Sequence, residues 1–308
     1  MGDAAGIGPE IIIKALADNE LYSKIRPLVI GDAEAFLQTA DTIRSSGKFV
    51  SFDTAEIFDL KNIPDGFNFG EVSAATGKAA GECIEKAVEL WNRGEIDAIC
   101  TAPINKKSLS LGGYEFPGHT EFIANLTDTK EFAMSFFAEK LRVVLLSTHL
   151  PLSAAIGRVK AGALAELINF TDRSLSQLLK RKVQIAVAGL NPHASENGMF
   201  GSEERNEMEP AIAQCASSGI DVSGPYSPDT IFLRGYRGEF DAVIACYHDQ
   251  ATIAVKCLSF GSAVNVTLGL PLVRTSVDHG TAFDIAGKGI ADESSMKAAI
   301  LLAGELAK

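Results

Sequence analysis

The chain has 308 residues, a formal net charge of −11 at pH 7, and 46% hydrophobic and 22% charged residues. This length allows one large domain or two ordinary ones with a sizeable core, and no apolar run approaches the roughly 18 residues that span a bilayer. A negative chain disfavours non-specific nucleic-acid binding, which depends on cations meeting phosphates. We therefore expect neither a nucleic-acid partner nor a membrane. A small anionic ligand stays open, because four basic residues stand beside glycine-, proline- or histidine-containing segments: Lys106, Lys107, Lys256 and Arg274.

The cysteines and the first residues bear on the compartment. Five cysteines are scattered without CxxC spacing, which argues against a disulfide framework and for a reducing environment. The opening MGDAAGIGPE shows neither the basic nor the apolar region of a signal peptide. We expect a cytoplasmic protein.

The first third of the chain alternates between helical and strand patterns. GDAAGIGPE predicts a glycine-rich turn running into a helix with Pro9 near its start, an arrangement that a strand usually feeds. No strand stands before Met1, so either the sequence is internal to a longer protein or the sheet lacks one expected element. Further along, the pattern predicts strands at 27–32, 48–53 and 96–103 and helices at 33–47 and 74–93.

Two adjacent apolar runs, 132–139 and 141–149, are joined by Glu139 and Lys140 and predict a hairpin. The remaining sequence predicts helices at 160–180, 203–219 and 291–307, strands at 183–193 and 239–250, and strand-rich sequence at 262–276. Such alternation is typical of an α/β fold with a mainly parallel sheet.

All five histidines lie in short polar clusters, and three of them follow apolar runs: His149, His193 and His248. Ligands of open α/β sheets bind outside the carboxyl ends of strands, so these imidazoles are candidates for one metal site. Three histidines leave positions open for water or substrate, as a catalytic metal needs, and Asp249 could support its neighbour. Their separations match no short zinc motif, so polar packing remains the alternative for each.

Other segments suit an anion. His119 and Thr120 stand before a helical stretch, where backbone amides can cradle a phosphate; a helix N-cap by Thr120 is the competing interpretation. The GDAAGIGP glycines do not fit GxGxxG, which argues against a Rossmann site. A loop that touches a phosphate or lines a cleft stays open, with a tight turn as the alternative. Lys256, Asn265 and Arg274 would suit a phosphate or carboxylate, although solvated surface cations are common.

Long motifs recur in order almost from end to end: MGDAAGIGPE, TAPINK, FPGHTEFIA, LSTHLPL, GLNPHASENG, GSEE, YHDQ and VNVTLGLPLVRTSVDHGTAFDIAGKG. The chain thereby resembles the 4-hydroxythreonine-4-phosphate dehydrogenase family, with its 4-phosphothreonate and 4-phosphoerythronate dehydrogenase paralogues. It departs from the family pattern at Ala4 and Ala251, neither of which is a ligand position.

The resemblance implies an isocitrate/isopropylmalate dehydrogenase-like two-domain α/β/α fold with the active site in the interdomain cleft. One domain would comprise 1–115 and 265–308; the other, 116–264, would carry most metal ligands and dimer contacts. It implies a homodimer whose active site is shared between subunits. It also implies NAD and a divalent metal as cofactors, zinc first, with magnesium, cobalt or manganese as alternatives.

The implied reaction is the oxidation and β-decarboxylation of 4-phosphohydroxy-L-threonine to 3-amino-2-oxopropyl phosphate in pyridoxal phosphate biosynthesis. The alternative is 4-phospho-D-threonate or 4-phospho-D-erythronate dehydrogenation in sugar-acid catabolism. Remoter alternatives are a phosphate acyltransferase-like enzyme and a non-catalytic binding module.

The resemblance also implies a role for each matching position. It assigns the metal to His149, His193 and His248, and the phosphorylated substrate to His119, Thr120, Lys256, Asn265 and Arg274. Lys256 is also a candidate for proton transfer, with a metal-linked water as the alternative, and Asp249 is a support of the metal ligands. For the cofactor we expect Gly6, His279 and Asp284, with a turn-stabilising role as the alternative for His279.

Overall fold

The computed structural model describes residues 1–47, 55–63, 67–259 and 262–308, so the strand expected at 48–53 lies outside the described residues. The chain divides into two compact units, unit 1 (Met1–Lys130 with Leu270–Lys308) and unit 2 (Glu131–Gly269). The boundaries expected from the sequence were 115/116 and 264/265. The α/β class is confirmed, since both units combine helices with parallel strands.

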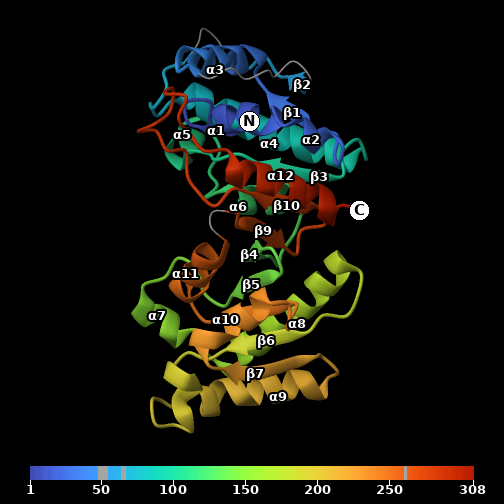
Figure 1. Cartoon of the computed structure of the whole chain (residues 1–308), viewed down its shortest axis with the longest axis vertical. Helices are drawn as coiled ribbons and strands as arrows, with labels where there is room; N and C mark the ends of the chain where they lie inside the picture. The colour runs from blue at the N-terminus through green and yellow to red at the C-terminus, as the bar shows by residue number, and fades with distance from the viewer. Residues whose placement is uncertain (48–54, 64–66, 260–261) are drawn as a thin grey trace. The chain divides into compact units, whose positions relative to one another are not determined.

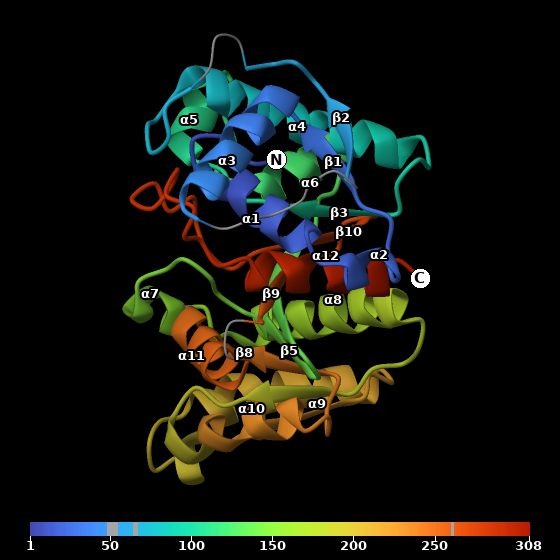
Figure 2. The same ribbon diagram turned by 45° about the horizontal axis from the view of Figure 1, so that its top comes forward.

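Unit 1 contains two parallel strand pairs, β1 with β2 and β3 with β10. Helix α4 contacts β1 and β3, while α12 contacts β3, β10 and α1 (Figure 1, Figure 2). The elements of unit 1 are α1 (Gly8–Leu16), α2 (Asn19–Tyr22), β1 (Leu28–Gly31), α3 (Ala33–Ser45), β2 (Glu56–Asp59), α4 (Ala74–Asn92), β3 (Ala98–Thr101), α5 (Lys106–Leu111), α6 (His119–Leu126), β10 (Val273–Ser276) and α12 (Ser294–Leu306).

Unit 2 is built on a sheet with the strand order β9-β4-β5-β8-β6-β7. Its elements are β4 (Ala133–Ala138), β5 (Leu141–Leu145), α7 (Leu152–Gly157), α8 (Ala161–Leu179), β6 (Ile185–Ala188), η1 (Pro192–Glu196), η2 (Glu204–Met208), α9 (Glu209–Ser217), β7 (Val222–Tyr226), α10 (Pro228–Tyr236), β8 (Ala242–Ala245), α11 (His248–Ser259) and β9 (Val264–Leu268).

The expected hairpin is confirmed: β4 runs antiparallel to β5, and Glu139 takes a positive φ of 53° in the turn. From β5 onward the strands β5, β8, β6 and β7 are parallel. All residues of β6 and β8 are buried, as expected where helices cover both faces of a parallel sheet. Helices α10 and α11 contact each other and the strands β5 and β8.

Two sequence-based expectations need correction. The strand expected over 239–250 ends at Ala245, and His248 is the first residue of α11, because the polar YHDQ segment begins a helix. The helix expected over 203–219 is a π-helical turn followed by α9, which has Pro210 in its first turn. A proline is tolerated there because the first helical amides lack intrahelical partners. The sequence analysis also missed the strands β2 and β7 and the helices α2, α5, α7, α10 and α11.

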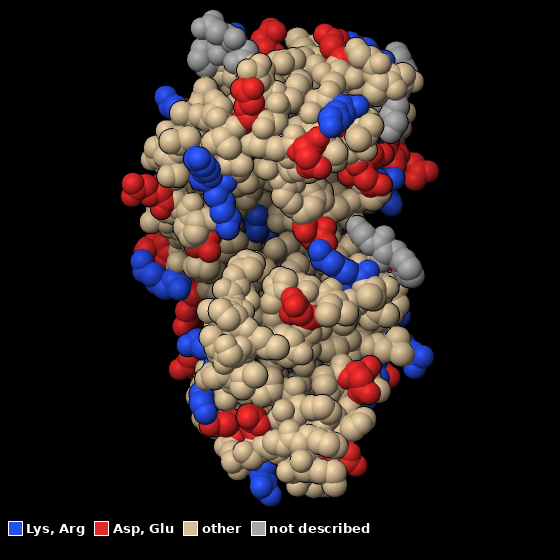
Figure 3. All heavy atoms as spheres, turned by 90° about the vertical axis from the view of Figure 1, so that its left-hand side faces the viewer, with Lys and Arg blue, Asp and Glu red and all other residues tan. Residues whose placement is uncertain are grey.

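No helix of the described residues is long and apolar enough to cross a membrane. All five cysteines are free. On the face drawn in Figure 3, acidic and basic side chains are interspersed, and no continuous basic surface is visible there.

The contact between α4 and α5 depends on a glycine. A Cβ at Gly77 would lie 1.8 Å from the Ser108 carbonyl oxygen, so we expect Gly77→Ala to force the helices apart and lower the free energy of unfolding by more than about 3 kcal/mol. Gly162 in α8 is the matched control, since a Cβ there meets no described atom within 4 Å. Gly162→Ala should be neutral or stabilise by up to about 1 kcal/mol. Urea unfolding measures both, and equal effects of the two substitutions would contradict the expectation.

Candidate functional site

The three histidines at the ends of apolar runs lie at one edge of the unit 2 sheet. The strands that precede them, β5, β8 and β6, are adjacent and parallel. His149 follows the end of β5, His248 follows the end of β8, and His193 follows the end of β6. The sequence predicts that these histidines follow the carboxyl ends of strands, and the sheet topology places them there.

Two of these imidazoles are neighbours. The ring centroids of His149 and His248 are 5.7 Å apart, at an interplanar angle of 41°. The Nδ1 atom of His248 forms a 2.7 Å hydrogen bond with Asp249 Oδ1, which leaves Nε2 as the ring nitrogen for a ligand. A carboxylate on the far nitrogen of a metal-binding imidazole is the usual supporting arrangement. This pair thus fits one side of a divalent-metal site.

His193 does not join the pair within one chain. Its ring lies 6.4 Å from the ring of Phe200, and no group of three or more His, Cys, Asp or Glu side chains among the described residues could hold a metal ion. His193 begins a run of positive φ angles that continues through Asn197, with values from 44° to 66°. Left-handed backbone costs a non-glycine residue roughly 1–2 kcal/mol, so other contacts have to hold this loop.

Two carboxylates anchor the His193 loop through Asn191. The Asn191 backbone amide donates to Glu204 Oε1 over 2.7 Å, and its side-chain amide donates to Glu203 Oε2 and Glu204 Oε2 over 2.9 Å each. The pKa of Glu203 is lowered by hydrogen bonds, first from its own backbone amide and then from Asn191. Glu204 is buried. Together these bonds fix where the strained loop leaves β6.

Sequence reasoning gave no role to Gln250, which connects two of the strand ends. The Cys246 amide donates to Gln250 Oε1 over 2.7 Å, and Gln250 Nε2 donates to the Gly189 carbonyl over 2.8 Å. Cys246 follows β8 and Gly189 follows β6, so one side chain joins the chain segments that carry His248 and His193. The YHDQ motif was the available signal, but the partner at Gly189 is 61 residues away.

Unit 1 brings together three of the residues predicted to bind an anion. Arg274 of β10 is 3% exposed; its Nη2 donates to Thr101 Oγ1 over 2.8 Å and its Nη1 to Thr120 Oγ1 over 3.4 Å. Burial lowers the pKa of Arg274 to about 10, so the guanidinium stays charged at neutral pH. Thr120 is not the N-cap of α6, which is Gly118. A charged guanidinium, hydroxyls and the start of a helix are groups that bind anions in proteins.

His119 belongs to the same cluster and is held neutral. Burial lowers the pKa of His119 well below 6.5, and the charge of Arg274 lowers it further. A hydrogen bond from the ring to the backbone of Ala102 opposes this shift. That bond uses the one N–H of the neutral ring, so the other ring nitrogen is a hydrogen-bond acceptor.

The depressed pKa of His119 predicts a pH effect on stability. As the pH falls through about 6.5, the unfolded chain takes up a proton that the folded chain does not. The His119 contribution to the free energy of unfolding therefore decreases below pH 6.5, by up to about 1.4 kcal/mol per pH unit. Chemical unfolding of the wild type and His119→Asn measures how the free energy of unfolding changes with pH. The range of about pH 5 to 8 spans the pKa of histidine in an unfolded chain. An unchanged acid-side slope in the variant would contradict the assignment.

The remaining predicted substrate residues lie in unit 2. Lys256 is exposed on α11, about two turns after His248, and Asn265 is half-buried on β9, opposite Phe136 of β4. The two other candidate cations, Lys106 and Lys107, lie in unit 1 and are exposed at the start of α5.

The residues expected at the cofactor lie in unit 1, where the glycine turn packs on the segment after β10. A Cβ at Gly6 would lie 2.9 Å from the Thr281 carbonyl oxygen, and the Ile7 amide donates to that oxygen over 3.0 Å. His279 Nδ1 is 3.1 Å from the Gly280 carbonyl oxygen, and Asp284 is exposed. Gly6 thus permits a close backbone approach.

Comparison with known proteins adds independent findings. Residues 23–303 match the family described as "Pyridoxal phosphate biosynthetic protein PdxA". The chain is 46% identical over 318 residues to "D-threonate 4-phosphate dehydrogenase" of Cupriavidus necator, covering 100% of this chain and 96% of the relative. It is 42% identical over 323 residues to the protein of the same name from Salmonella typhimurium, covering 100% and 97%.

A solved structure agrees with these relatives. The crystal structure of a 4-hydroxythreonine-4-phosphate dehydrogenase from Klebsiella pneumoniae is similar, with a TM-score of 0.90 and 42% identity. The similarity covers 100% of this chain and 98% of that one.

Proposed function

Since this chain belongs to the PdxA family and is a dehydrogenase acting on a CH–OH group, we propose that its substrate is 4-phospho-D-threonate. The proposal rests on two relatives named for that substrate, which are 46% and 42% identical to this chain over its full length. The family description itself fits the reading first expected from the sequence, 4-phosphohydroxy-L-threonine in pyridoxal phosphate biosynthesis. The relatives' names favour the alternative of sugar-acid catabolism.

In this proposal, the phosphate binds to the unit 1 cluster of Arg274, Thr120 and His119. The buried guanidinium supplies a full positive charge and Thr120 supplies a hydroxyl. Neutral His119 adds no charge, and its ring nitrogen not bonded to Ala102 can accept a hydrogen bond from the substrate. Lys256 and Asn265 complete the contacts to the substrate, as expected from the resemblance.

We further propose that the enzyme is a homodimer with a divalent metal, zinc first, at the edge of the unit 2 sheet. His149 and His248 would hold it from one subunit, with Asp249 orienting His248, and His193 would come from the partner subunit. The separation of His193 from the other two within one chain supports this arrangement. When bound, the ion supplies Lewis-acid polarisation of the substrate hydroxyl.

The proposed oxidation removes a hydride and a proton from the secondary alcohol at carbon 3, and the hydride goes to NAD. Gly6, His279 and Asp284 would hold NAD, since the glycine turn and the segment after β10 lie together. The resulting ketone is β to the carboxylate, so loss of carbon dioxide leaves dihydroxyacetone phosphate. Lys256 or a water carries the protons.

A substrate panel tests the proposal: 4-phospho-D-threonate, 4-phospho-D-erythronate and 4-phosphohydroxy-L-threonine, with NAD and with NADP, followed by absorbance at 340 nm. We expect kcat/KM to be at least about tenfold higher for 4-phospho-D-threonate than for the others. A preference for 4-phosphohydroxy-L-threonine would restore the reading first expected from the sequence. Binding without turnover of any of the three would leave a binding module.

The Gln250 bridge leads to a prediction on metal affinity. Gln250→Leu leaves the Cys246 amide and the Gly189 carbonyl without their partner, so the two histidine-bearing segments lose their common anchor. We expect a loss of roughly 10- to 100-fold in zinc affinity, as for other supports of metal ligands. Competition with a chelator measures it. Gln250→Glu keeps the acceptor for Cys246 and should lose less; equal affinity in the wild type and Gln250→Leu would contradict the prediction.

A further inference from the structure

Two residues proposed to bind the phosphate, Arg274 and His119, are attached to one short stretch of unit 1. Arg274 Nη2 donates to the hydroxyl of Thr101, the last residue of β3, over 2.8 Å. The His119 ring hydrogen-bonds to the backbone of Ala102, the next residue along the chain. Residues 102–105 belong to no helix or strand, so contacts with other parts of the chain have to fix the path of this segment.

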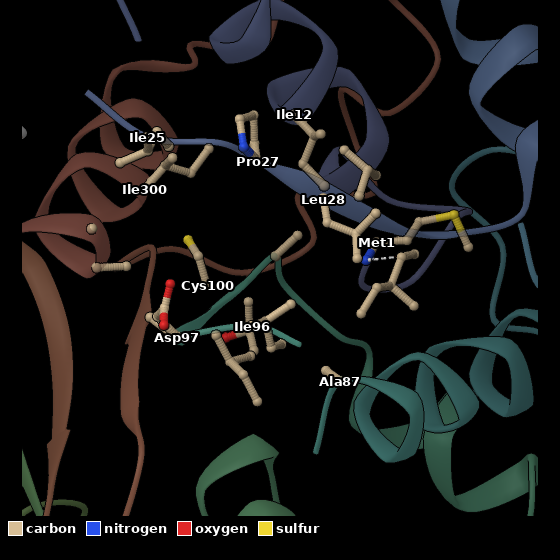
Figure 4. A pocket seen from close by; sticks show the side chains of 18 of the residues that line it. Met1, Ile12, Ile25, Pro27, Leu28, Ala87, Ile96, Asp97, Cys100 and Ile300 are labelled. Atoms are coloured by element: carbon tan, nitrogen blue, oxygen red, sulfur yellow. Dashed lines mark hydrogen bonds between the residues drawn. The ribbon is translucent and has the colours of Figure 1, made fainter. Parts of the chain in front are cut away.

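Asp3, in the glycine turn, holds the segment after β3 at two points. Its backbone amide donates to the Pro103 carbonyl over 2.9 Å, and its carboxylate hydrogen-bonds to the Asn105 backbone. The turn is itself attached to β1, because the Met1 nitrogen donates to the Ile30 carbonyl over 2.9 Å (Figure 4). Asp3 thus connects β1 to the segment that carries the contacts of Arg274 and His119.

The Asp3 carboxylate has more partners than a tight turn requires. Asp3 is fully buried. Burial raises its pKa, whereas hydrogen bonds from the Ala5 amide, from the Thr76 and Ser108 hydroxyls and from the Asn105 amide lower it. The turn needs only the 3.0 Å bond from Ala5, two residues further on. The other three donors belong to α4, to α5 and to the residue before α5, so the carboxylate gathers three parts of unit 1 at one point.

The turn alone does not explain an acidic residue at this buried position. Burying a carboxylate without partners is unfavourable, and Asn or Ser would form the same kind of turn without a charge. A carboxylate differs from both because it only accepts hydrogen bonds. The four donors around Asp3 therefore match the acid itself, and one of them is the amide at the far end of the segment after β3.

We propose that Asp3 is a positioning residue of the phosphate site: it fixes the segment 102–105, so that His119 and Arg274 meet the phosphorylated group together. This role rests on the proposed function, which places the phosphate at these two side chains. Asp3 is itself buried and acts through the segment. Its loss should therefore raise the KM of the phosphorylated substrate and leave the KM of NAD unchanged.

The test follows the His119 ring signals in NMR spectra of the full chain while inorganic phosphate is added, with His119→Asn to assign the signals. Asp3→Asn keeps the size of the side chain but places an amide N–H₂ among hydrogen-bond donors. We expect this variant to shift the His119 signals of the phosphate-free protein. It should also raise the Kd for phosphate at least about tenfold, since misplaced binding groups lose much of their effect.

Two further variants separate positioning from general destabilisation. Thr76→Val removes one donor to Asp3 and keeps nearly the same shape, so it should change the His119 signals in the same direction and raise the Kd by a smaller factor. It decides the question if Asp3→Asn does not fold. Glu10→Gln weakens a buried contact elsewhere in unit 1, between α1 and the 289–291 loop, and should leave the Kd for phosphate unchanged.

The outcomes distinguish this role from the proposed function. Wild-type His119 signals and wild-type phosphate affinity in folded Asp3→Asn, or in Thr76→Val if Asp3→Asn does not fold, would overturn the role of Asp3. So would an equal loss of affinity in Glu10→Gln. If phosphate shifts no His119 signal in the wild type, the proposed phosphate site is wrong. A shift of the phosphate-free signals in Asp3→Asn would then still support the control of His119 by Asp3.

Discussion

His193→Ala and His248→Ala are each expected to reduce NAD-dependent turnover by at least about 1000-fold and to lose the bound metal. The reason is that three imidazoles fill a site which leaves the remaining positions to water or substrate. With one removed, the ion is held by too few ligands to persist. Turnover is measured at 340 nm, and metal content by mass spectrometry after dialysis.

The same two variants test whether the site is shared between subunits. If His193 reaches the pair of His149 and His248 from the partner, a dimer of one His193→Ala and one His248→Ala subunit has one intact site. Random mixing makes half of the dimers mixed, so about a quarter of wild-type activity should return. Mixtures that stay inactive would place all three ligands in one chain and contradict the shared site. Asp249→Asn is the milder comparison, because it keeps a hydrogen-bonding oxygen beside His248.

How far the sequence predicts this structure depends on how local each signal is. The helix over 74–93 was predicted within one residue at its end, because an apolar stripe and the glycine after it are properties of one segment. Gly94 takes a φ of 69° after the C-cap, as that prediction requires. The histidines at strand ends were also predictable, since parallel strands bring their carboxyl ends to one edge.

The features that the sequence does not predict depend on contacts between residues that are far apart in the chain. The left-handed loop at His193 is held by Glu203 and Glu204 through Asn191, and no periodicity indicates that contact. Likewise, the start of α11 at His248 follows from packing against β4 and β5, which a search for apolar runs cannot detect. The positions of the three imidazole rings depend on these backbone details. The sequence therefore predicts that the histidines lie at the same end of the sheet, but not whether all three rings of one chain come together.

The largest effect on stability is expected at a buried ion pair that the sequence analysis did not identify. Lys14 Nζ donates to Glu10 Oε1 over 2.6 Å, and also to the carbonyl oxygens of Gly289 and Ala291 over 3.1 and 2.7 Å. The Ala291 amide donates back to Glu10 Oε1 over 2.8 Å. The pair therefore ties α1 to the loop before α12, and both side chains are almost fully buried.

Lys14→Met should lower the free energy of unfolding by about 3–5 kcal/mol, because it leaves the Glu10 carboxylate buried without its counter-charge. The corresponding fall in Tm is about 5–8 °C. Glu10→Gln with Lys14→Met should cost less than Lys14→Met alone, since the amide keeps an oxygen for the Ala291 N–H and no unpaired charge remains. Calorimetry of the wild type, both single variants and the double variant measures the coupling. Additive losses would show that the two side chains act separately, and the stability would then come from the contacts of each with the 289–291 loop.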